Sequence, residues 1–177
     1  MNTNFQMTRT GFYLPSMKPV PIYTDDMSRF RRFFTAFKSR HWQIDEPGNY
    51  TIYVPFLETS LMIPHLFIFD GASIPRPLWP FMAPTGILFI PGLFHDFGFK
   101  YGCFLNEKKE IIFAGESRKF FDKVFRDMST WINDVYLAEA ISYRAVRLGA
   151  WPVWNKYRRN ISPEDVYKDF PGLGMVV

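Results

Sequence analysis

The stretch "IPGLFHDFGFKYG", residues 90–102, decides the fold class. Pro91 falls in a first helical turn, where its missing N–H costs nothing, and Gly102 is a natural helix stop. Between them the apolar positions have helical spacing: Leu93, Phe94, Phe97 and Tyr101. We therefore predict a helix here, with His95 and Asp96 on the flanks of its apolar stripe.

The composition is that of a folded protein. The chain has 177 residues, of which 47% are hydrophobic and 19% aromatic, including 20 Phe. This is too apolar for disorder and long enough to bury a core. The net charge of +4 is too small to indicate nucleic acid by itself. A single cysteine, Cys103, excludes an internal disulfide and a cysteine-based zinc site, and we interpret it as a small buried hydrophobe.

Three segments are predicted to form strands. Residues 42–54 resemble a hairpin, because apolar and polar residues alternate on both sides of a turn at 47–49. Residues 65–70 form a further strand that ends at Asp70, and residues 103–113 a second hairpin that turns at 106–109. These strands predict a small antiparallel sheet.

Two more helices are predicted after the second hairpin. Residues 115–128 place their phenylalanines on one face, and residues 129–149 follow the same spacing up to Gly149. The fold class is therefore α+β, with a small antiparallel sheet packed against three to four helices. We predict a single domain over 1–177, with a core at about 40–152, an N-terminal arm and helix within 1–40, and a C-terminal tail at 153–177.

The helix predicted over residues 28–40 has a phenylalanine face and a basic face. Such a helix can bind phosphates of nucleic acid or a membrane, but core docking with a solvated basic face explains it more simply. Nucleic acid is therefore the weakest of the partner hypotheses. We expect no signal peptide, because the first residues lack an apolar core. Residues 77–94 are uncharged, but four prolines exclude a transmembrane helix there.

The first candidate site residue is Asp70, which ends a strand and opens the stretch "DGASIPRP". A tight bend and two prolines would hold its carboxylate in one orientation, which suits either catalysis or a structural ion pair. Ser73 can cap the turn, and Arg76 is the nearby partner in the structural alternative.

His95 and Asp96 are the second and third candidates. Adjacent residues of a helix point about 100° apart, so each must find its main partner elsewhere. If the helix packs on the sheet, one of them can face the turn at Asp70. Asp70 would then orient His95, whose imidazole would act as a base near neutral pH.

Asp122 is a supporting candidate with two interpretations. It lies at the edge of the phenylalanine face of its helix, and Arg118 and Arg126 are each four residues away, so a surface ion pair explains it. Together with Asp70, His95 and Asp96 it would also supply one nitrogen and three oxygens to a divalent metal ion. Spacing alone does not single out a ligand set, and His95, Asp96 and Asp122 remain the metal candidates.

The motifs "FDGASIPRPLWPFMAPTG", "GLFHDFGFKYG" and "SRKFFDKVFRDM" resemble a family of small proteins of unknown function found largely in tailed phages and prophages. The family motifs are Asp-x-Ala-Ser-Ile/Val-Pro-Arg, which matches here from Asp70 to Arg76, and His-Asp-x-x-Tyr, in which Phe99 stands here for the tyrosine. Arg118 and Asp122 match the following helix. The resemblance covers about residues 40–152 and implies a phage origin and a shared polar cluster, without an activity.

Two hypotheses of different classes follow. The first is a hydrolase acting on host envelope or peptidoglycan through Asp70, His95 and Asp96, with Asp122 in support and a divalent metal as a candidate cofactor. The second is a non-enzymatic virion or host-interaction protein, in which the polar cluster specifies the fold and the aromatic loop contacts a partner. The expected partners are other phage proteins or the host envelope, and the expected location is the host cytoplasm during infection or the virion.

Overall fold

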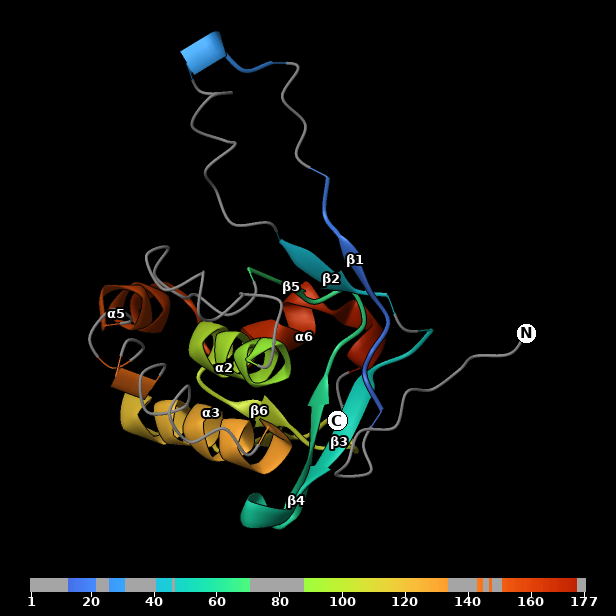
Figure 1. The fold of residues 1–177 in the computed structure, drawn as a ribbon, viewed down its shortest axis with the longest axis vertical. Helices are drawn as coiled ribbons and strands as arrows, with labels where there is room; N and C mark the ends of the chain where they lie inside the picture. Colours follow the sequence, from blue (N-terminus) through green and yellow to red (C-terminus); the bar gives the residue numbers. More distant parts are fainter. Residues whose placement is uncertain are drawn as a thin grey trace.

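The computed structural model describes residues 13–21, 26–30, 41–45, 47–70, 88–133, 143–144, 147 and 151–174. The described chain is an α+β fold, as the sequence predicts (Figure 1). Its elements are β1 (Met17–Pro19), β2 (Trp42–Ile44), β3 (Tyr50–Val54), η1 (Pro55–Leu57), β4 (Thr59–Ile63), β5 (Ile68–Phe69), α2 (Phe89–Tyr101), β6 (Phe104–Leu105), β7 (Ile111–Ile112), α3 (Arg118–Asn133), α5 (Trp151–Asn160), α6 (Asp165–Asp169) and η3 (Pro171–Leu173).

The described strands form two antiparallel sheets, where the sequence predicts one. Three strands pair in the order β1-β2-β5 and four in the order β3-β4-β6-β7. The longest pairing joins β3 to β4 over five residues, from Tyr50 opposite Ile63 to Val54 opposite Thr59. Alternate residues of β3 are buried, beginning with Tyr50, so the predicted alternation is confirmed.

The predicted hairpin over residues 42–54 is wrong. β2 pairs with β1 and β5, whereas β3 pairs with β4, so the turn at 47–49 carries the chain from one sheet to the other. Alternation along a strand specifies which side chains face the core, but not which strand lies next to it. The predicted hairpin over residues 103–113 is confirmed, since β6 pairs with β7. Its turn is held by Asn106, whose side-chain oxygen accepts the backbone N–H of Lys108 and of Glu110.

α2 is the central helix of the fold: in Figure 1, α3 lies below it, α5 lies to its left, and most of the strands lie above it and to its right. Its bounds confirm the predicted helix, and Gly102 ends it in the left-handed conformation at φ 66°. Of its 13 residues, 10 are buried, so α2 has no broad solvent-facing side. Asp96 and Lys100 are among the residues of α2 that are only partly buried.

α3 packs closely on α2 at Gly98. A Cβ at this position would lie 2.5 Å from Cδ1 of Phe121, so only glycine allows this approach. α3 also continues to Asn133, past the break that the sequence predicts after Met128. Most of the second predicted helix, over 129–149, lies outside the described residues, as does most of the predicted helix over 28–40.

The segment after Trp151 packs into the core. Trp154 of α5 lies with its ring centroid 5.1 Å from that of Phe99 and 5.4 Å from that of Phe121. Further along, Val166 and Leu173 are buried with the central cluster. This C-terminal segment therefore covers α2 and contributes to the core that positions the candidate site.

Arg158 of α5 caps the carboxyl end of α2. Its guanidinium donates to the backbone oxygens of Tyr101 at 2.9 Å, Lys100 at 2.5 Å and Phe99 at 3.2 Å. These carbonyls have no partner within the helix, and the cation also interacts favourably with the negative end of the helix dipole. A Cβ at Gly102 would lie only 1.7 Å from Nη1 of Arg158, so the cap requires a glycine there.

No helix in the described ranges is long and apolar enough to cross a membrane. Most of the uncharged run at 77–94, and all of the predicted turn residues after Asp70, lie outside these ranges.

We predict that Arg158→Ala lowers the free energy of unfolding by about 2 to 3 kcal/mol, because several carbonyls of α2 lose a charged donor. The neighbouring Arg159, which is exposed, provides the control: Arg159→Ala should change it by less than about 0.5 kcal/mol. Urea unfolding at neutral pH measures both. Equal losses in the two variants would contradict the capping role.

Candidate active site

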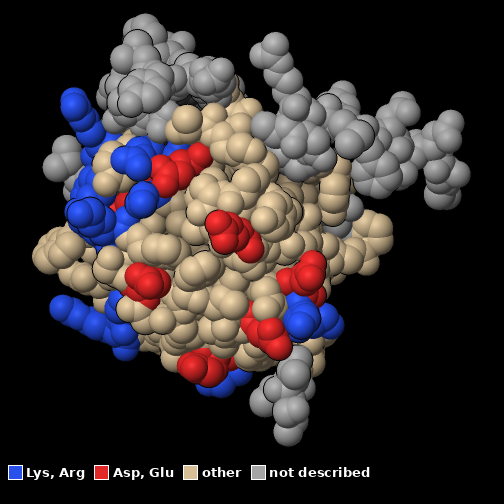
Figure 2. Space-filling model, turned by 90° about the horizontal axis from the view of Figure 1, so that it is seen from below, with Lys and Arg blue, Asp and Glu red and all other residues tan. Residues whose placement is uncertain are grey.

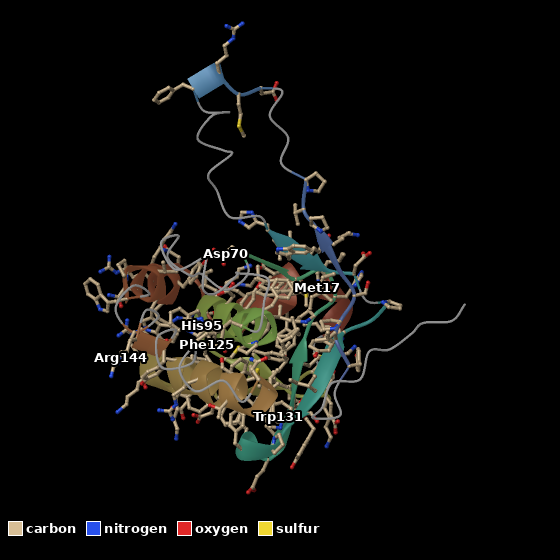
Figure 3. The ribbon with its side chains drawn as sticks, viewed as in Figure 1. Met17, Asp70, His95, Phe125, Trp131 and Arg144 are labelled. Carbon is tan, nitrogen blue, oxygen red and sulfur yellow. The ribbon has the colours of Figure 1, made fainter. Side chains whose placement is uncertain are left out.

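Four of the predicted site residues come from three described elements. Asp70 directly follows β5, His95 and Asp96 lie on α2, and Asp122 lies on α3. In Figure 3, His95 lies beside Phe125 of α3, and Asp70 lies on the same side of the fold, beyond α2. Ser73 and Arg76 lie outside the described residues.

His95 is bonded to Asp122. Its Nε2 lies 3.1 Å from Oδ1 of Asp122, and the two residues are only 8% and 0% exposed. The imidazole is held between Phe99, at a centroid distance of 4.0 Å, and Phe125, at 5.3 Å. We expected Asp70 to orient the imidazole, but the carboxylate that is hydrogen-bonded to it is that of Asp122.

Asp122 is not part of a surface ion pair, so that interpretation is wrong. Its Oδ2 accepts a hydrogen bond from Nη1 of Arg147 at 2.9 Å, and Nε of Arg118 lies 3.9 Å away. Arg126, the other predicted partner, pairs with its neighbour Asp127 at 2.7 Å. The buried carboxylate is thus surrounded by cationic groups from three parts of the chain.

The spacing of residues along α3 indicates that Asp122 is buried. Asp122 precedes Phe125 by three residues and Ser129 by seven, which is the spacing of one helical face, and all three are buried. A carboxylate on that face needs partners from another element. Those partners are 25 and 27 residues away in the sequence, at Arg147 and His95, which local spacing cannot identify.

The environment of His95 favours its charged form. Burial lowers the pKa of the imidazole, but Asp122 and Asp96 together outweigh it, and the pKa is raised above its usual 6.5. The bond to Asp122 is satisfied when Nε2 carries a proton, so in neutral His95 the lone pair lies on Nδ1. Nδ1 is 3.9 Å from Oδ1 of Asp96, which is too long for a direct hydrogen bond.

Asp96 interacts with a second carboxyl group. The pKa of Asp96 is raised to about 7, first by burial and then by the neighbouring carboxyl group of Asp70, against the opposing effect of His95. The side chain is 22% exposed, so it is the more accessible neighbour of His95. Two carboxyl groups that share a site hold a proton at a pH where an ordinary aspartate is ionised.

Tyr157 is a site residue that sequence reasoning missed. It lies on α5, and its pKa is raised first by burial and then by the charges of Asp96 and Asp70. Tyr157 is therefore within the electrostatic influence of both carboxyl groups. No motif pointed to it, because α5 comes from the predicted tail.

Metal binding receives no support from the described residues. No three histidine, cysteine, aspartate or glutamate side chains among them are grouped so as to hold an ion. Of the candidate ligands, Asp122 directs its two oxygens at His95 and Arg147. A cation would have to compete with both.

Comparison with protein families matches residues 42–146 to the model of a family described as "Protein of unknown function (DUF1353)". The chain belongs to this family. The DUF1353 region includes Asp70, His95, Asp96 and Asp122, whereas Arg147 and Tyr157 follow its end. Searches of curated proteins and of solved structures gave no significant match.

We predict that Asp122→Ala lowers the free energy of unfolding by about 3 kcal/mol or more, because two arginines and His95 lose their shared partner. Asp127→Ala removes a carboxylate of the same helix that pairs near the surface, and should cost less than about 1 kcal/mol. Chemical unfolding at pH 7 compares the two. A loss for Asp122→Ala no larger than for Asp127→Ala would contradict the buried network.

The stability of the wild type should fall as the pH rises from about 4, where unfolded aspartate begins to release its proton, to somewhat above 7. The raised pKa of Asp96 means that the folded state holds a proton that the unfolded state has released, and this stabilisation is lost as the pH passes about 7. The raised pKa of His95 acts in the same direction, and its contribution is lost above 6.5. Asp96→Asn removes the contribution of Asp96 to the pH dependence, and it weakens that of His95 because the imidazole loses a neighbouring carboxyl group.

We therefore expect Asp96→Asn to be more stable than the wild type at pH 8.5, by about 1 kcal/mol or more, with a flatter dependence on pH. Asp127→Asn is the matched control and should keep the wild-type slope. Urea unfolding across this range measures the effect, and parallel curves for wild type and Asp96→Asn would contradict it.

Proposed function

We propose that the protein is a hydrolase in which Asp70 and Asp96 carry acid–base chemistry. His95, held by Asp122, supports them. The proposal is carried by the place of Asp96, whose Oδ1 lies 3.9 Å from Nδ1 of His95 and whose pKa is raised to about 7, first by burial and then by the charge of Asp70. An acid and a base that exchange a proton near the working pH are what general acid–base catalysis requires.

The proposed reaction adds water across a bond of the substrate. Asp70 takes a proton from the attacking water, and protonated Asp96 gives its proton to the leaving group. After product leaves, the proton passes from Asp70 back to Asp96. This cycle consumes one water and leaves both carboxyl groups as they began.

His95 has a positioning role in this scheme. It is too buried to touch a large substrate, but its Nδ1 faces Asp96. When His95 is charged it favours ionised Asp96, and when it is neutral it favours protonated Asp96. Asp122 keeps the imidazole in the orientation that makes this coupling effective.

We further propose that the substrate is a component of the bacterial envelope, and peptidoglycan is the first substrate to test. This rests on the resemblance to phage and prophage proteins, for which the host envelope is an obstacle during infection. Both glycosidic and amide bonds of peptidoglycan are hydrolysed by paired acid and base groups.

The test is release of soluble fragments from purified peptidoglycan by wild type, Asp96→Asn and Asp70→Asn between about pH 5 and pH 9. We expect a maximum near pH 7 and a loss of about 100-fold or more in either variant. Asp127→Asn, which changes a carboxylate remote from the pair, should keep wild-type activity. Undiminished fragment release by Asp96→Asn would refute the assigned roles.

A second candidate function is that of a non-enzymatic virion or host-interaction protein. The observation in its favour is the exposed apolar start of α5, where Trp151 and Val153 are 60% and 46% exposed. In this alternative the network around Asp122 only holds α2 against α3. It predicts that no substrate is turned over and that Trp151→Ser weakens retention of the protein in purified particles, while Asp96→Asn does not.

A further inference from the structure

Arg118 carries a buried donor that the described structure leaves unpaired. Its side chain is 16% exposed, and Nη1 has no hydrogen-bond acceptor within the described residues. Leaving a charged donor buried without a partner costs on the order of 1 to 3 kcal/mol or more. Such a cost is tolerated where the donor has a ligand to bind.

The charge balance around Asp122 also favours an anion. One carboxylate faces Arg147 and Arg118 through Oδ2 and His95 through Oδ1. Two arginines against one aspartate leave a net positive charge even when His95 is neutral. On the other side of His95, Oδ1 of Asp96 lies 3.9 Å from Nδ1, and that side of the site is acidic.

The positive half has an open side. The side chain of Arg147 is 32% exposed, so it connects the buried network to the surface. Further basic residues lie near it in the sequence or on α3, among them Lys119, Lys123 and Arg144. In the face shown in Figure 2 the largest group of lysine and arginine side chains lies at the left, with acidic side chains among them and elsewhere on the face. Figure 3 labels Arg144 on that side.

We propose that Arg118 and Arg147 form a subsite for an acidic group of the substrate, either a carboxylate or a phosphate. Arginine is suited to both, because its planar guanidinium can donate two parallel hydrogen bonds. The bond to be cleaved would then lie across His95, at Asp96 and Asp70. That the bound group belongs to a substrate rests on the proposed function, whereas the binding of an anion by the two arginines does not depend on it.

The probes are inorganic phosphate and acetate, each titrated into the full chain at constant ionic strength set with chloride. Binding is followed by the NMR signal of the Arg118 Nε–H and by the pKa of His95, which a nearby anion should raise. We expect saturable binding of at least one probe. Arg118→Gln should weaken it at least tenfold.

Arg126→Gln is the control, because it removes the same charge from the same helix but from a surface pair with Asp127. It should change the affinity by less than twofold. If Arg118→Gln does not fold, Arg118→Lys replaces it, with an expected loss of at least threefold because lysine lacks the forked donor. Absence of saturable binding for both probes, or equal losses in Arg118→Gln and Arg126→Gln, would overturn the subsite.

The two probes and one further variant separate the outcomes. Tighter binding of phosphate indicates a phosphorylated substrate, and tighter binding of acetate indicates a carboxylate. Asp96→Asn should still bind the anion, since it leaves both arginines in place. If the wild type binds the anion but hydrolyses no substrate, only the proposed function is refuted. If the wild type hydrolyses the substrate but Arg118→Gln binds the anion as tightly as the wild type does, only the subsite is refuted.

Discussion

The structure depends on one buried carboxylate. Asp122 is fully shielded from solvent, and a charge in that position is tolerated only when its oxygens are paired. Its partners come from α2, from α3 itself and from Arg147. The network therefore fixes the position of α3 against α2, at the point where Gly98 lets the helices approach closely. It also fixes the orientation of His95.

The same network divides the site into two halves. On the Nε2 side of His95, cationic groups outnumber the single carboxylate, whereas on the Nδ1 side Asp96 meets Asp70. A buried imidazole between a positive and an acidic region couples the protonation of one to the other. This polarity is what makes acid–base chemistry on a charged substrate the function that we propose. A purely structural ion pair would not need the carboxyl pair beside it.

The local features of the fold could be predicted from the sequence, and the non-local ones could not. The central helix with its Gly102 stop and the hairpin at 103–113 depend on neighbours in the chain, and both are confirmed. The pairing of β2 with β1 and β5 depends on residues more than 20 positions away, and the hairpin expected there is wrong. The same limit applies to the site, where Asp122 was expected at the edge of the core in a surface ion pair or a metal site, and Tyr157 was not expected at all.

The central claim is that Asp96 shares its proton near neutral pH beside a His95 oriented by Asp122. The most direct measurement is an NMR titration of the Asp96 carboxyl carbon and the two His95 ring nitrogens in the intact protein. The account predicts an Asp96 pKa of about 7 and a His95 that keeps its proton on Nε2 when it is neutral. An Asp96 that titrates as an ordinary carboxyl group, near a pKa of about 4, would contradict it.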